Sequence, residues 1–98
     1  MPIRIFRVKD NSMRPSLTDG DYVIVSQLHY LFSKPKARDM IVLKHPKKDL
    51  LMIKRIDRET PYGYFVLGDN IAQSEDSRSF GTVDKSLIVG KVISVVRR

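Results

Sequence analysis

The chain has 98 residues, a formal net charge of +7 and no cysteine. This length suits one domain with a modest core, so we expect residues 1–98 to form a single unit. Without cysteine, the chain has neither a disulfide framework nor a thiolate metal site, and the two histidines, His29 and His45, lie far apart in the sequence. We therefore expect no metal site.

The positive charge permits an anionic partner, but the Lys and Arg residues are scattered along the chain, with short runs only at 34–38 and 44–48. Such scatter is typical of a solvated surface, so we expect no nucleic-acid partner. No apolar run approaches the roughly 20 residues that cross a membrane, and no signal-peptide pattern opens the chain. These features predict a cytoplasmic domain without a membrane anchor, unless an anchor precedes this sequence.

Short runs rich in Val, Ile, Leu, Tyr and Phe, separated by Pro, Gly, Asp and Asn, predict strands. In chain order, these runs cover residues 3–8, 22–26, 40–44, 50–56, 64–67 and 87–96. A helical period is not sustained anywhere, although residues 28–32 allow one helical turn. We expect the apolar side chains of residues 30–32 to cap the core rather than to contact a substrate. The pattern predicts an all-β fold, built as a small barrel-like or coiled sheet.

The first candidate for chemistry is Ser12, which lies in the stretch 11–17 between the first two predicted strands. Asn, Pro, Gly and Asp residues around it predict a turn. The Ser12 hydroxyl would then lie at the edge of a sheet, on a backbone that neighbouring strands hold still. That position suits a nucleophile, although serines are also common in turns without any chemical role.

The second candidate is Lys54, in a run that has the character of a buried strand. Alternation along a strand places Met52, Lys54 and Ile56 on one face and Arg55 on the other. Burial lowers the pKa of a lysine, and a neutral amine can take the proton of a serine hydroxyl. Arginine stays charged, so Lys54 is the candidate base. Alternatively, Lys54 extends to the surface from an edge strand.

A polar loop follows the predicted strand at 64–67 and supplies the third group of candidates. Residues 68–70 are Gly, Asp and Asn, which predict a turn. Asp76 and Arg78 are close enough in sequence to pair with each other, and Ser74 can donate or accept a hydrogen bond. A surface ion pair stabilises a protein by only about 0–1 kcal/mol, so a structural role for this pair requires burial.

Together, the three segments resemble the signal peptidase I family of Ser/Lys endopeptidases. Residues 11–21 are similar to its nucleophile box, residues 53–55 to its lysine box, and residues 64–90 to its third box, in the same order along the chain. The resemblance covers nearly the whole chain and implies a serine peptidase, a hydrolase of the all-β signal peptidase and LexA-peptidase type.

The resemblance also implies a role for each candidate. Ser12 would be the nucleophile, Lys54 the general base, and Ser74 the group that holds the lysine amine. Asp76 and Arg78 would form the ion pair that shapes the loop beside the site. Two further residues would set the turn and line the pocket, namely Met13 and Pro15.

Several positions depart from the family pattern. Members usually carry an amino-terminal membrane anchor, and larger members insert a second β subdomain where this chain has only residues 57–63. Asp10 stands two residues before Ser12, where some members have a serine that helps to bind the oxyanion. The resemblance implies that the backbone N–H of Ser12 is one oxyanion donor. An ionised carboxylate cannot donate, so the second oxyanion donor is not identified. Arg38 replaces the usual glycine before Asp39.

A short branch of the family, the nickel-type superoxide dismutase maturation proteases, is similar in its length, its His45-Pro46 pair and its compact spacing. That resemblance implies a precursor protein as the partner, with propeptide processing that removes a short amino-terminal leader from nickel-type superoxide dismutase. The protease itself would need no cofactor. Cleavage of secretory signal peptides is the alternative within the family.

Two readings from other classes stay open. A LexA-like autoproteolytic domain would share the dyad, but it needs a cleavable segment, and only eleven residues precede Ser12. A non-catalytic basic binding module would show a steep salt dependence of nucleic-acid affinity. The basic stripe with exposed aromatic side chains that such a module needs is not evident, so we rank it last.

Overall fold

The computed structural model describes residues 2–98. Within this range, the strands form one antiparallel sheet in the order β1-β2-β6-β3-β4-β5. The strands are β1 (Ile3–Arg7), β2 (Tyr22–Ser26), β3 (Met40–Lys44), β4 (Leu51–Thr60), β5 (Gly63–Leu67) and β6 (Ile88–Val96). Short helical turns join them, namely α1 (His29–Phe32), η1 (Ile71–Gln73), α2 (Ser77–Phe80) and η2 (Lys85–Leu87). The predicted all-β fold is confirmed.

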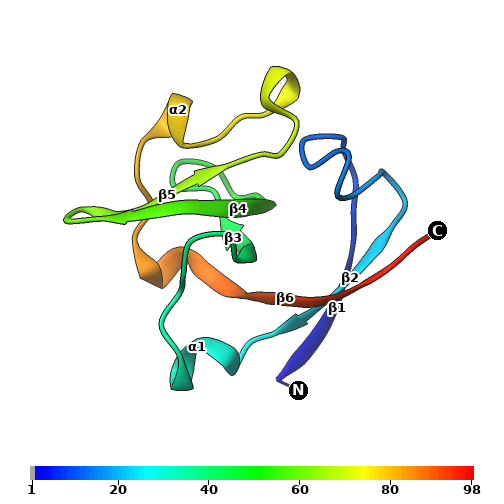
Figure 1. Ribbon diagram of the computed structural model, residues 1–98, viewed down its shortest axis with the longest axis horizontal. Coiled ribbons are helices and arrows are strands. Elements are labelled where there is room, and N and C mark those ends of the chain that lie inside the picture. The colour runs from blue at the N-terminus through cyan, green and yellow to red at the C-terminus, as the bar shows by residue number, and fades with distance from the viewer. Residues whose placement is uncertain (1) are drawn as a thin grey trace.

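The long strand β6 connects the two halves of the sheet (Figure 1). Its residues 91–96 pair with β2, and its residues 88–91 pair with β3. The register shifts once in each pairing, and such irregularities increase the local twist of a sheet. Figure 1 shows the result, in which β1 and β2 lie at one end of β6 and β3, β4 and β5 at the other.

Two clusters of buried side chains lie on opposite faces of the central strand β3. Ile41 and Leu43 point into one cluster, whereas Val42, between them, points into the other. This alternation follows from the period of two along a strand. The Val42 cluster includes Met13 and Leu17 from the turn after β1, so apolar packing holds that turn against the sheet.

The predicted strand boundaries agree closely with the observed ones, except at the end of β4. That strand continues through polar residues to Thr60, because a tight hairpin turn joins it directly to β5. Thr60 pairs with Gly63, whose φ of +135° suits glycine. The connection between β4 and β5 therefore contains no additional subdomain.

The α1 turn corrects one expectation. Tyr30 packs against the core, and its hydroxyl donates to Oδ2 of Asp39 at 2.7 Å. Leu31 and Phe32 are exposed, so they do not cap the core as predicted. A single helical turn can press only one side of its surface against the sheet. No helix in residues 2–98 has the length and apolar character needed to span a membrane.

Arg38 shows why glycine suits its position. It adopts a φ of 77°, in the left-handed region that costs energy for residues with a Cβ. Its carbonyl oxygen accepts a hydrogen bond from Nη1 of Arg55 at 3.0 Å. The strained backbone at Arg38 thus helps to orient the Arg55 side chain of β4.

Candidate active site

The turn that carries Ser12 is held by hydrogen bonds from Asn70 and by apolar packing of its own side chains. Asn70, after β5, donates from its backbone N–H to the Ser12 carbonyl oxygen at 2.8 Å and from Nδ2 to the Asn11 carbonyl oxygen at 3.0 Å. Met13 and Leu17 are buried in the core. Ser12 is 7% exposed, so most of its surface is buried and a small part reaches solvent.

Lys54 lies on β4, opposite Ile41 of β3. It is 3% exposed, and its neighbours on the same face, Met52 and Ile56, are buried as the alternation predicts. The alternative in which Lys54 extends to the surface is therefore wrong. Its Nζ donates a hydrogen bond to Oγ of Ser74 at 3.1 Å.

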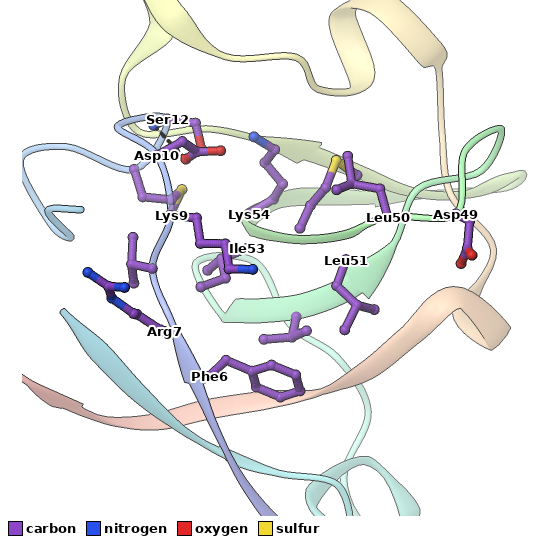
Figure 2. A pocket seen from close by; sticks show the side chains of 14 residues that line it. Phe6, Arg7, Lys9, Asp10, Ser12, Asp49, Leu50, Leu51, Ile53 and Lys54 are labelled. Carbon is purple, nitrogen blue, oxygen red and sulfur yellow. Dashed lines mark hydrogen bonds between the residues drawn. The ribbon is translucent and has the colours of Figure 1, made fainter. Parts of the chain in front are cut away.

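Ser12 and Lys54 line the same cavity, which has a volume of about 350 Å³. Figure 2 shows the Lys54 side chain extending toward the turn that carries Asp10 and Ser12. The end of β1 and the start of β4 form the walls, and most of their side chains are apolar. The lining residues are Phe6, Arg7, Val8, Lys9, Asp10, Ser12, Met13, Val42, Asp49, Leu50, Leu51, Met52, Ile53 and Lys54.

The surroundings of Lys54 favour its neutral form. Burial lowers the pKa of the Lys54 amine below its ordinary value of 10.5, and the positive charge of Arg78 acts in the same direction. The carboxylates of Asp10, Asp76 and Glu75 oppose this shift but do not cancel it. A larger share of the amine is thus unprotonated near neutral pH than in an exposed lysine.

Removing this amine is expected to stabilise the protein. In the Lys54→Met variant, the free energy of unfolding should exceed that of the wild type by about 1 kcal/mol at pH 7, because functional sites often retain destabilising groups. Below the lowered pKa, both folded and unfolded states bind the proton, and the full cost of the buried charge remains. Between that pKa and 10.5, only the unfolded state binds the proton, so the stability of the wild type rises with pH. The difference in unfolding free energy between Lys54→Met and the wild type therefore shrinks as the pH rises.

Urea unfolding of both proteins at pH 7 and at pH 10 measures this difference. A variant that is less stable than the wild type at both pH values would contradict the expectation, since Lys54 would then contribute more through its contacts than its burial costs.

Asp76 organises the loop after β5. It is fully buried and accepts four hydrogen bonds, from the Gly68 N–H at 3.0 Å, the Arg78 N–H at 3.1 Å, and Nε and Nη2 of Arg78 at 3.0 Å each. Burial by itself would raise the pKa of Asp76, but the hydrogen bonds from Arg78 and Gly68 outweigh it and hold that pKa below the ordinary value. The ion pair with Arg78 that the sequence suggested is present.

Replacing Asp76 by asparagine should destabilise the fold by about 2–3 kcal/mol, the size of hydrogen bonds to a charged group. The contribution of a carboxylate with a lowered pKa is complete above its ordinary value of 3.8 and is lost as the pH falls through the folded value. The difference in unfolding free energy between Asp76→Asn and wild type should therefore be full at pH 7 and smaller at pH 3.

A matched control is Asp84→Asn, because Asp84 caps a 3-10 turn by accepting the Ser86 N–H at 2.9 Å but is exposed. Its effect should stay below about 1 kcal/mol, as for an exposed cap. Equal effects at the two positions would show that the burial of Asp76 is unimportant.

The two remaining candidates from the sequence are Met13 and Pro15. Met13 lines the cavity, and its sulfur accepts a hydrogen bond from the Asp69 N–H at 3.4 Å. Pro15 is exposed in the same turn and is not among the lining residues, so the expectation that it lines the pocket is wrong. The turn directs its ring toward solvent. In residues 2–98, no group of three or more His, Asp or Glu side chains is placed to hold a metal ion.

Sequence reasoning missed the connecting role of Asp69. Its carboxylate accepts from Nε and Nη2 of Arg55 on β4 at 2.9 Å each, and from the Ser16 hydroxyl at 2.6 Å. Asp69 thus links the Ser12 turn, the Lys54 strand and the loop after β5. The only signal in the sequence was a Gly-Asp-Asn turn, which does not indicate partners so far away along the chain.

Comparison with known proteins agrees with this geometry. The family model described as "Signal peptidase, peptidase S26" matches residues 1–57 and 60–97. Signal peptidase I of Aquifex aeolicus (strain VF5) is 44% identical over 52 residues, which are 52% of this chain and 20% of that protein. Signal peptidase IB of Staphylococcus aureus is 45% identical over 60 residues, which are 60% of this chain and 31% of that protein. The aligned part is therefore less than a third of the length of these curated relatives.

Proposed function

This chain belongs to the signal peptidase family, peptidase S26, and from that premise we propose that Ser12 and Lys54 form the catalytic dyad of a serine endopeptidase. The observation that carries the proposal is a buried lysine that opens onto the same cavity as a serine on a fixed turn. The Ser74 hydroxyl, 3.1 Å from the Lys54 amine, fixes the direction of the base. Dyads of this kind replace the histidine of a triad by a desolvated lysine.

The proposed reaction has two stages. Neutral Lys54 takes the proton of the Ser12 hydroxyl while Oγ attacks the scissile carbonyl carbon, and the Ser12 N–H donates to the oxyanion that forms. The Lys54 ammonium then protonates the leaving nitrogen as the C–N bond breaks, which leaves an acyl ester on Ser12. Water attacks this ester after losing a proton to Lys54, and Lys54 returns the proton to Oγ as the acid product leaves.

The cavity supports a peptide as the substrate. Its walls from β1 and β4 are mostly apolar, which suits an extended peptide with apolar side chains beside the cleaved bond. We propose that residues 1–98 act as one catalytic domain, in the cytoplasm, on a precursor with a short amino-terminal leader. The first candidate is the nickel-type superoxide dismutase precursor, supported by the direct β4–β5 hairpin and the His45-Pro46 pair.

Secretory signal peptides are the second candidate. The observation that favours them is that the similar curated proteins are named signal peptidase I and signal peptidase IB. Both candidates require the same dyad, so only substrates can separate them.

Intact-mass spectrometry separates the candidates when the protein is incubated with a nickel superoxide dismutase precursor and, in parallel, with a signal-peptide precursor. Ser12→Ala and Lys54→Ala serve as controls, and the protein alone at alkaline pH tests self-cleavage. A single amino-terminal cut of the first precursor, absent from both variants, supports the maturation role. A cut of the second precursor only would replace it by signal-peptide cleavage, and no Ser12-dependent cut would contradict the peptidase.

A further inference from the structure

The Ser12 N–H, which the proposed mechanism uses to bind the oxyanion, already has an acceptor. It donates to Oδ1 of Asp10 at 3.1 Å, and Figure 2 shows this hydrogen bond beside the Lys54 side chain. A backbone N–H offers a single hydrogen. A scissile carbonyl oxygen can therefore use this donor only after the Asp10 carboxylate has left it.

The charge of Asp10 also acts on Lys54. Among the carboxylates that raise the pKa of Lys54 against the larger lowering by burial, Asp10 has the strongest effect, ahead of Asp76 and Glu75. Asp76 forms an ion pair with Arg78, and Glu75 forms one with Lys48. Within residues 2–98, Asp10 forms no salt bridge. Its charge therefore favours the Lys54 ammonium without an ion-pair partner to offset it.

The hydrogen bond and the charge of Asp10 both disfavour the first chemical step, which needs a free N–H donor and a neutral amine. We propose that Asp10 holds the site in a resting state, in which its carboxylate occupies the oxyanion donor, the Ser12 N–H, until a bound substrate displaces it. This inference rests on the proposed Ser12/Lys54 dyad. Because Asp10 is exposed at the cavity edge, its side chain has room to rotate away when a peptide carbonyl enters.

A consequence concerns how removal of Asp10 affects different substrates. Displacing the carboxylate from the Ser12 N–H costs the same free energy for a long precursor as for a short peptide, because the resting state is a property of the free protein. Removing Asp10 should therefore raise kcat/KM for a short peptide and for a full precursor by a similar factor.

Nuclear magnetic resonance of the free protein tests the resting state without any substrate. In Asp10→Ala, the Ser12 amide proton should move upfield relative to wild type, because its charged acceptor is gone. The titration of the Lys54 amine, followed through labelled lysine, should move to lower pH in both Asp10→Ala and Asp10→Asn. Asp49→Asn is the matched control, since Asp49 lines the same cavity without bonding to Ser12, and it should leave both signals in place.

Kinetics test the effect on catalysis. At pH 7, kcat/KM for the precursor should rise about 5-fold in Asp10→Ala, which corresponds to one net hydrogen bond. In Asp10→Asn, whose amide oxygen can still accept the Ser12 N–H, the ascending limb of the pH profile, which reports loss of the proton from Lys54, should move to lower pH. Ser12→Ala, measured in parallel, should be inactive.

Two outcomes would overturn the inference. One is a Ser12 amide signal and a Lys54 titration that are identical in wild type and Asp10→Ala. The other is a lower kcat/KM in both Asp10 variants while their spectra show folded protein, which would make Asp10 a support of the turn instead. Cleavage that persists in Ser12→Ala would refute the proposed dyad. The Ser12 amide signal and the Lys54 titration would still decide whether Asp10 accepts the Ser12 N–H.

Discussion

Replacement of Ser12 by alanine is expected to lower kcat/KM for precursor cleavage by at least about 10³-fold, as for loss of one member of a catalytic set. Lys54→Met should have an effect of similar size, because it removes the proposed base that takes the proton of the serine hydroxyl. The double variant should be no slower than either single variant, since residues that act as one unit lose their function together. Steady-state kinetics on the cleaved precursor measure all three.

A control within the same turn is Ser16→Ala, because the Ser16 hydroxyl donates to Asp69 rather than facing the cavity. Its loss should cost less than about 10-fold, the size expected for one hydrogen bond remote from the reacting atoms. Lys54→Arg separates the base from a mere positive charge, since a guanidinium stays protonated. Full activity in Lys54→Arg would show that Lys54 acts only by its charge, and the dyad would then be wrong.

Gly68→Ala is expected to damage the site without changing any group that takes part in the chemistry. A Cβ on Gly68 would overlap Oγ of Ser74 and would lie 2.7 Å from the carbonyl oxygen of Ser12. Both contacts are far too short, so either Ser74, which holds the Lys54 amine, or the turn that carries Ser12 must move. We expect a loss of about 1–3 kcal/mol in unfolding free energy, as for overpacking. Activity should fall about 10²-fold, as for a displacement of about 1 Å.

Gly81→Ala provides the matched control for this prediction. Gly81 has a φ of 83°, so alanine there is strained, but an added Cβ would meet nothing within 4 Å. The variant should lose stability and keep its activity per folded molecule. Urea unfolding measures the loss of stability and kcat/KM measures the loss of activity. Together they separate backbone strain from displacement of Ser12 and Ser74. Equal activity in both glycine variants would show that the space around Gly68 does not position Ser12 and Ser74.

The sequence by itself predicted those features that depend on neighbours along the chain. The period of two in residues 50–56 correctly placed Lys54 on the buried face with Met52 and Ile56, because side chains alternate on any strand. Strand positions followed from short β-branched runs between turn residues for the same local reason. The end of β4 was missed because its last residues, Asp57 to Thr60, are polar, and an exposed hairpin accepts polar side chains that an apolar pattern does not reveal.

Only the tertiary structure decided which groups meet. Asp69 bonds to Ser16, Asn70 to Ser12, and Gly68 lies against both Ser12 and Ser74, across separations that no local pattern encodes. The acceptor of the Ser12 N–H could not be predicted from the sequence either, because the Asp10 side chain can turn toward solvent or back onto the turn. Local periodicity determines which face a side chain takes, whereas the packing of distant segments determines its partners, and the chemistry of this site depends on those partners.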